Sequence, residues 1–223
     1  MSLFDGKPMP QRGLGPDNAL QTPPDLYASL DAVFGPFDLD VCASDENHLA
    51  PMYFTEDASC LQAEWGPTFY TKGKKTLERP NRAYLNPPFS EDLNPGDIVK
   101  KAFEEALAGR CSTLVCIPGY KREFDWWADY VVGAQGHGAT GIIDASGPKG
   151  NRRIDFWRNG SPVGSPNQRI TFIWYQAGLV SAEARWHYRL PWTGTLWLPG
   201  YQLRLPRIAI DGILNVRGIN GVA

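Results

Sequence analysis

The chain has 223 residues, 43% apolar and 21% charged, a composition typical of globular proteins that excludes wholesale disorder. No apolar run approaches the roughly 18 residues of a membrane-spanning helix, and the first residues predict no secretory signal. Four irregularly spaced cysteines (Cys42, Cys60, Cys111 and Cys116) predict neither a disulfide framework nor a metal site, so we expect a cytoplasmic protein without metal.

Charge is distributed unevenly along the chain. Residues 1–64 hold two basic and eleven acidic side chains, a net charge of −9, and the remainder carries +7. The second part suits a polyanion, whereas the first part suits a cationic ligand. Two ordinary solvated surfaces explain the same division equally well, so charge alone decides nothing.

The first half of the chain alternates turn-rich and periodic segments. Residues 1–20 contain six Gly or Pro and predict an arm without regular structure. A helix is expected next, capped by Thr22 and continuing with helical apolar spacing to Val33. Residues 37–42 alternate apolar and polar side chains as a strand does, residues 71–82 predict an exposed basic loop, and residues 83–85 predict a short strand.

The second half begins with the clearest helix, which Asn94 and Pro95 open and Gly109 closes. A buried strand over 112–117, a helix over roughly 123–132, and strands near 140–145 and 169–175 follow. This order predicts an α/β protein with a parallel sheet and right-handed crossovers. After Ala184, short aromatic and β-branched segments predict a β-rich C-terminal extension.

The segment Asn86-Pro87-Pro88-Phe89 follows a predicted strand, where open α/β sheets bind their ligands. An exocyclic base amine is a poor nucleophile because its lone pair is delocalised into the ring. The Asn86 side-chain oxygen and the Pro87 carbonyl can accept its two hydrogens, two prolines stiffen the turn, and Phe89 offers a stacking face. A proline turn with a capping asparagine is the alternative, but we favour an amine-binding site.

The same tetrapeptide resembles the amine-methylation motif of S-adenosylmethionine-dependent nucleic-acid methyltransferases. From about Thr22 to Tyr175, the chain resembles the phage and prophage DNA N-6-adenine-methyltransferase (Dam-like) family, and the landmarks that carry this resemblance follow one another in order. They are Thr22-Pro23, Phe37-Asp38-Leu39-Asp40-Val41-Cys42-Ala43-Ser44, Tyr53-Phe54-Thr55, Trp65, Asn86-Pro87-Pro88-Phe89-Ser90, Lys101-Ala102 and Ile117-Pro118. The resemblance implies a Rossmann-like methyltransferase sheet over residues 21–183, between a flexible arm (1–20) and the β-rich extension (184–223).

The resemblance also implies which residues hold S-adenosylmethionine. Asp40 takes the acidic position at the end of the first strand, although an aspartate there is equally often a cap. The remaining positions implied are Thr22, Pro23, Cys42, Ala43, Asn47 and Asn86. Three departures stand out. Cys42-Ala43-Ser44 replaces the glycine-rich turn common in methyltransferases, and Gly119-Tyr120-Lys121-Arg122 replaces the Arg-Thr-Asp run after Pro118. Ala58-Ser59-Cys60-Leu61 replaces Asp-Gly-Leu, so the acidic group near the cofactor's adenine is either missing or supplied by Asp57.

Basic residues near the same sheet edge are candidates for phosphate contacts: Lys121, Arg122, Arg152 and Arg153. The sequence thus predicts a DNA adenine-N6 methyltransferase, monomeric or homodimeric, in the bacterial host cytoplasm of a phage or prophage. Methylation of another planar amine or amide (cytosine N4, RNA adenine, protein glutamine) stays open. A non-catalytic nucleic-acid-binding module on the same fold is the further alternative.

Overall fold

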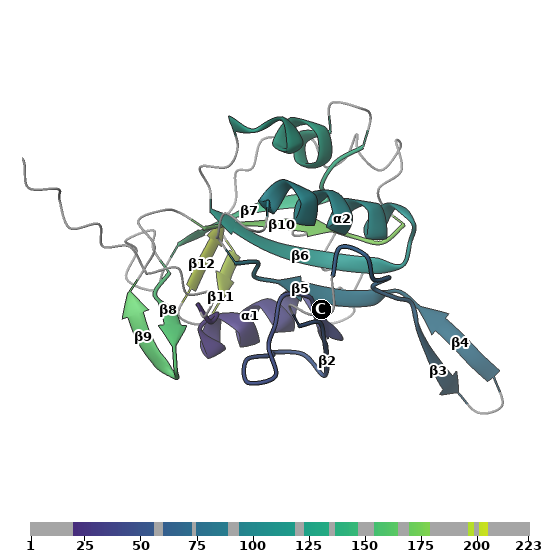
Figure 1. The fold of residues 1–223 in the computed structure, drawn as a ribbon, viewed down its shortest axis with the longest axis horizontal. Coiled ribbons are helices and arrows are strands. Elements are labelled where there is room, and N and C mark those ends of the chain that lie inside the picture. The colour runs from purple at the N-terminus through teal and green to yellow at the C-terminus, as the bar shows by residue number, and fades with distance from the viewer. Residues whose placement is uncertain are drawn as a thin grey trace, which may run out of the picture.

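The computed structural model describes residues 20–55, 60–72, 75–88, 94–118, 123–133, 137–146, 154–164, 170–178, 196–198 and 201–204. Its centre is an eight-stranded sheet with helices on both faces (Figure 1). The strand order is β11-β12-β7-β10-β6-β5-β1-β2. This mixed α/β arrangement agrees with the predicted class.

One half of the sheet is parallel. It consists of β2 (Met52–Tyr53), β1 (Leu39–Asp40), β5 (Asn81–Leu85) and β6 (Cys111–Pro118), each parallel to its neighbour. Strand β1 is shorter than the six-residue strand that the alternation predicts. In β1, β5 and β6, nearly all described side chains are buried, as expected of parallel strands that are covered on both faces.

The other half is antiparallel, so the prediction of a parallel sheet holds for one half only. Strand β10 (Ile170–Tyr175) lies between β6 and β7 (Gly141–Ser146) and runs opposite to both. Strands β12 (Tyr201–Arg204) and β11 (Leu196–Leu198) extend the same sheet beyond β7, also antiparallel. The strands after residue 184 therefore join the central sheet, while the boundary predicted at residue 184 stays a prediction.

The helices pack on opposite faces of the sheet (Figure 1). Helix α1 (Pro24–Phe34) buries Leu26, Leu30 and Phe34 in one core cluster. Helix α2 (Pro95–Leu107) and the π-helix η2 (Trp127–Val132) bury their apolar residues in a second cluster on the other face. The opening of α2 is as predicted, because the Asn94 Oδ1 accepts the Gly96 backbone N–H at 3.0 Å.

The predicted cap of α1 was wrong. Pro23 is the N-cap residue, and it makes no side-chain cap hydrogen bond. The Thr22 hydroxyl is instead 2.8 Å from the hydroxyl of Tyr84, on the neighbouring strand β5. Asp25 lies in the first turn, where its Oδ1 accepts the Leu26 N–H at 3.0 Å. A local capping pattern was therefore overridden by a partner 62 residues away.

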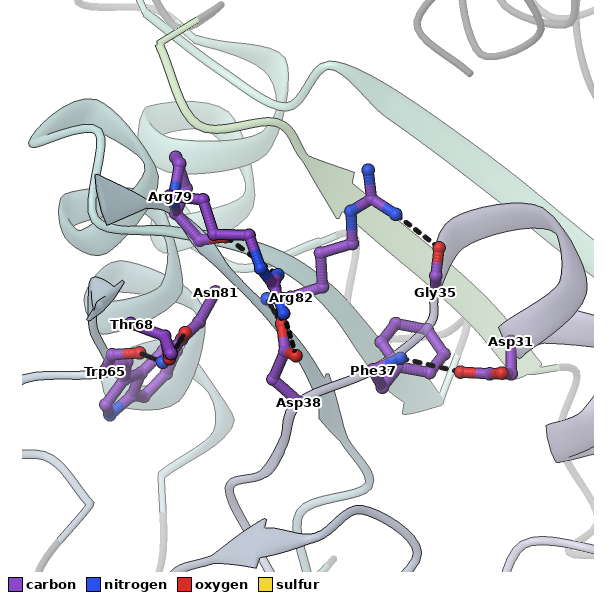
Figure 2. Close-up of polar contacts among 10 residues, drawn as sticks. Asp31, Gly35, Phe37, Asp38, Trp65, Thr68, Arg79, Asn81 and Arg82 are labelled. Carbon is purple, nitrogen blue, oxygen red and sulfur yellow. Dashed lines mark hydrogen bonds and ion pairs between the residues drawn. The ribbon is translucent and has the colours of Figure 1, made fainter. Parts of the chain in front are cut away.

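The predicted basic loop over 71–82 is a hairpin of β3 (Thr68–Lys72) and β4 (Lys75–Arg79), which projects from the sheet (Figure 1). Three interactions hold its base (Figure 2). The Arg79 guanidinium pairs with the Asp38 carboxylate at 2.7 Å, and Thr68 donates to Asn81, whose Nδ2 donates to the Trp65 carbonyl. Because β4 leads into the start of β5, the hairpin leaves the amino edge of the parallel strands.

A second hairpin pairs β8 (Phe156–Arg158) with β9 (Ser161–Gly164). This hairpin was not predicted from the sequence. Its turn places Asn159 at a φ of 49° and Gly160 at 74°, both in the left-handed region that tight turns use. Strand β8 also forms an isolated bridge with Gln21, ahead of helix α1.

Candidate functional site

The candidate residues gather where β1 and β5 end. These strands are parallel neighbours, with Asp40 opposite Tyr84. Cys42 and Asn86 each follow two residues later, so the two chain segments leave the sheet from the same edge. This is the carboxyl edge of the parallel strands, the usual location of ligand sites in open α/β sheets.

Asn86 is held at this edge by a contact with a distant segment. Its Nδ2 donates a hydrogen bond to the Leu20 carbonyl at 3.0 Å. Its Oδ1 is buried and has no hydrogen-bond partner among the described residues. The next residue, Pro87, is buried, and Pro88 is half-buried. A buried acceptor without a donor is costly, so the free oxygen marks Asn86 as a site for a ligand that donates a hydrogen.

Asp40 is a buried carboxyl group, with 4% of its surface exposed. Burial raises its pKa to about 6, against the lowering effects of backbone hydrogen bonds from Leu49 and Cys42 and of the charge on His48. The Leu49 N–H donates to its Oδ2 at 3.0 Å, which ties the following loop to the end of β1. A nearby cation would lower the raised pKa of this carboxyl group and so favour its ionised form.

The turn after β1 contains the other candidate cofactor residues. The Ala43 N–H donates to the Phe54 carbonyl at 3.0 Å, and Ser44 and Asn47 exchange backbone hydrogen bonds at 3.1 Å. The neighbouring Cys60 thiol, together with burial, raises the pKa of Cys42, and the Cys42 thiol lowers the pKa of Cys60. The turn is therefore fixed by its own contacts in place of glycines.

Residues 20–22 cross this edge and are called the strap below. The hydrogen bond between the Thr22 and Tyr84 hydroxyls joins the strap to β5, and Pro23 behind it is buried. Gln21 exchanges two backbone hydrogen bonds with Trp157 of β8, at 2.8 and 2.9 Å. Thr22 and Asn86 therefore both lie at the carboxyl end of β5, as a shared site requires.

Leu20 and Tyr84 are functional residues that were not predicted from the sequence. Leu20 acts through its carbonyl, which no sequence pattern identifies. Tyr84 did carry a signal, because a tyrosine in a buried strand needs a partner for its hydroxyl. Six predicted site residues lie outside the described residues and stay predictions: Phe89, Asp57, Lys121, Arg122, Arg152 and Arg153.

The described residues limit the chemistry that this edge of the sheet can perform. A rigid turn presents a hydrogen-bond acceptor, and a buried carboxyl group lies on the adjacent strand. Within the described ranges, no group of three or more metal-ligating side chains is close enough to hold an ion. None of the described helices has the length and hydropathy needed to cross a membrane.

Comparison with known proteins gives two matches. The family model described as DNA N-6-adenine-methyltransferase (Dam) matches residues 16–136, which include every described candidate residue. A DNA N-6-adenine-methyltransferase of Escherichia phage T1 is 34% identical over 84 residues, which are 38% of this chain. That match spans 29% of the phage protein's length, less than a third.

Proposed function

The chain belongs to the DNA N-6-adenine-methyltransferase family, and on this premise we propose that it transfers a methyl group from S-adenosylmethionine to the N6 amine of adenine in DNA. The observation that carries the proposal is the buried, unpartnered Oδ1 of Asn86 at the carboxyl edge of β5. An acceptor in that state suits an amine hydrogen. We also infer that the sheet is a Rossmann-like methyltransferase sheet with antiparallel strands added at one side.

The residues at the end of β1 fit the cofactor. Asp40 is a buried carboxylate whose charge a sulfonium cation would stabilise, and the turn through Cys42, Ala43 and Asn47 lies beside it. Thr22 and Pro23 border the same edge, and Asp57 is proposed for the adenosine part. When bound, S-adenosylmethionine supplies an electrophilic methyl carbon attached to a positively charged sulfur.

Asn86 and Pro87 bind the amine of the target adenine. Their side-chain and backbone oxygens accept the two N6 hydrogens and draw the amine nitrogen toward tetrahedral geometry. Phe89 stacks on the extruded base, and Pro88 keeps the turn rigid. The amine proton becomes acidic as nitrogen gains its fourth bond, so it leaves to water without a strong base. Positioning of this kind supplies on the order of 7–11 kcal/mol in well-oriented systems.

DNA is the proposed partner, bound through phosphate contacts from Lys121, Arg122, Arg152 and Arg153. The test uses the full chain, duplex DNA and methyl-labelled S-adenosylmethionine, followed by mass analysis of the nucleosides. We expect labelled N6-methyladenine. Labelled N4-methylcytosine would replace the proposed acceptor, and DNA binding without cofactor binding would support a non-catalytic module.

The assignment of Asn86 has its own test. Asn86→Ala should lower methylation at least about 100-fold, as loss of one transition-state hydrogen bond does, while cofactor affinity stays within a few-fold of wild type. Asn159→Gly is the matched control, because this exposed turn residue has a φ of 49° that glycine adopts without strain. Full activity of Asn86→Ala would reject the role.

A further inference from the structure

The strap allows only one orientation of the Asn86 side-chain amide. An amide group offers donors on nitrogen and an acceptor on oxygen, and the Leu20 carbonyl can accept but not donate. The 3.0 Å contact between Leu20 and Asn86 therefore fixes the nitrogen toward the strap. The oxygen is left as the free atom, which agrees with its lack of a partner among the described residues.

The Leu20 carbonyl is itself restrained through the next two residues of the strap. Gln21 is bonded to Trp157 through two backbone hydrogen bonds. The Thr22 hydroxyl is bonded to that of Tyr84, a side chain with no exposed surface. Strand β8 and strand β5 thus fix the two residues that follow Leu20, which restrains the Leu20 carbonyl from turning away from Asn86.

We propose that the strap is a positioning device, in which the Leu20 carbonyl orients the Asn86 amide and so makes this site require an amide at position 86. The proposal rests on the proposed function and deepens it. An aspartate would present an oxygen to the Leu20 carbonyl, where two acceptors repel. The Thr22–Tyr84 and Gln21–Trp157 contacts act through Leu20, so Thr22, Tyr84 and Trp157 are positioning residues toward this amide.

Asn86→Asp tests the orientation through its dependence on pH. The new carboxyl group is ionised at pH 8 and faces the Leu20 carbonyl without a donor. As the pH falls it takes up a proton, donates that hydrogen to Leu20 and keeps its other oxygen free. We expect methylation by the variant, relative to wild type, to rise at least tenfold between pH 8 and pH 5.5. Asp40 titrates in this range in both proteins and cancels in the ratio, whereas burial holds the pKa of Tyr84 well above its usual range, so Tyr84 stays protonated throughout.

The same variant gives a readout that needs no activity. Its unfolding by urea should show a deficit against wild type that shrinks as the pH falls from 8 to 5, because the protonated carboxyl group regains the bond to Leu20. A deficit that is equal at both pH values would overturn the proposal. So would full activity of Asn86→Asp at pH 8.

Tyr84→Phe tests the clamp. It should speed hydrogen exchange at the Gln21 amide at least tenfold and lower kcat about tenfold, with cofactor affinity unchanged within twofold. Tyr27→Phe is the matched control, since this ring packs 5.4 Å from that of Tyr84 and its hydroxyl has no hydrogen-bond partner in the described residues. Thr22→Ser, which keeps the hydroxyl, should behave as wild type in the exchange measurement.

These measurements distinguish failure of the proposed function from failure of the proposed role of the strap. A wild-type chain that methylates no DNA would reject the proposed function, whereas the urea and exchange measurements would still decide the strap. Wild-type methylation together with an unchanged Gln21 exchange rate and unchanged kcat in Tyr84→Phe would reject the strap alone.

Discussion

Replacing Asp40 by asparagine should stabilise the protein without ligand. The carboxyl group is 4% exposed, and burial raises its pKa from 3.8 to about 6. Two pKa units correspond to about 3 kcal/mol of free energy, which the ionised group subtracts from folding stability above pH 6. The amide keeps an acceptor for the Leu49 N–H but loses the second oxygen, so we expect a net gain of about 1–3 kcal/mol at pH 8.

The sign of the pH dependence follows from the direction of the shift. Because the folded pKa is raised, the folded protein holds its proton at pH values where the unfolded chain has lost it. Stability due to this group is therefore full below about pH 4 and is lost as the pH rises through 6. The advantage of Asp40→Asn should be small at pH 4, grow between pH 4 and 6, and be constant above pH 7.

The assay is urea unfolding of both proteins from pH 4 to 8, paired with calorimetric titration of S-adenosylmethionine. If Asp40 faces the sulfonium as proposed, the variant is more stable yet binds the cofactor at least about tenfold more weakly at pH 8. Opposite changes in stability and affinity separate a ligand role from a cap. A variant less stable than wild type at pH 8, or a stability difference that does not vary with pH, would refute the reasoning.

Three further outcomes are expected. Glu105→Gln should cost about 3 kcal/mol in urea unfolding at pH 7, because Glu105 is fully buried against Arg110 at 2.7 Å and Lys101 at 2.6 Å. Burial raises the pKa of Glu105, but the bonds from Arg110 and Lys101 outweigh burial and lower it, so the deficit should shrink as the pH falls through that lowered pKa; an unchanged deficit would contradict this. Arg79→Ala should cost about 1 kcal/mol in the same assay, since the Arg79 side chain is 40% exposed, and a neutral result would mean that Asp38 does not hold the hairpin base. Replacing Lys72, Lys74 and Lys75 together by alanine should leave kcat/KM on a short duplex within twofold of wild type, because their hairpin leaves the sheet edge opposite Asn86; a larger loss would place DNA on both edges.

Elements with strong local signals were predicted well. Helix α2 has an asparagine cap, a proline in its first turn and an apolar stripe, and it begins and ends within two residues of the prediction. Strands β6 and β10 are apolar runs bounded by turn residues, and both were found near their predicted bounds. In each case the residues that decide the structure are neighbours in sequence, so pattern and tertiary structure agree.

Elements that depend on distant partners were not predicted. The composition of residues 71–82 indicates an exposed basic segment, but the β3–β4 hairpin is fixed at its base by Asp38, some 40 residues earlier in the chain. Likewise, periodicity does not reveal that β10 inserts antiparallel between β6 and β7, because strand direction depends on the connections and not on the side chains.

Asn86 shows where sequence reasoning about a site ends. Residue type and placement after a strand are enough to predict an acceptor, because Asn-Pro-Pro is local. Which amide atom is free depends on Leu20, 66 residues away, whose contribution is a backbone carbonyl that every residue type shares. A site whose catalytic atom is selected by the main chain leaves no residue-type signal at the selecting position. The contribution of the Leu20 carbonyl is therefore revealed by substitution at position 86 and not at position 20.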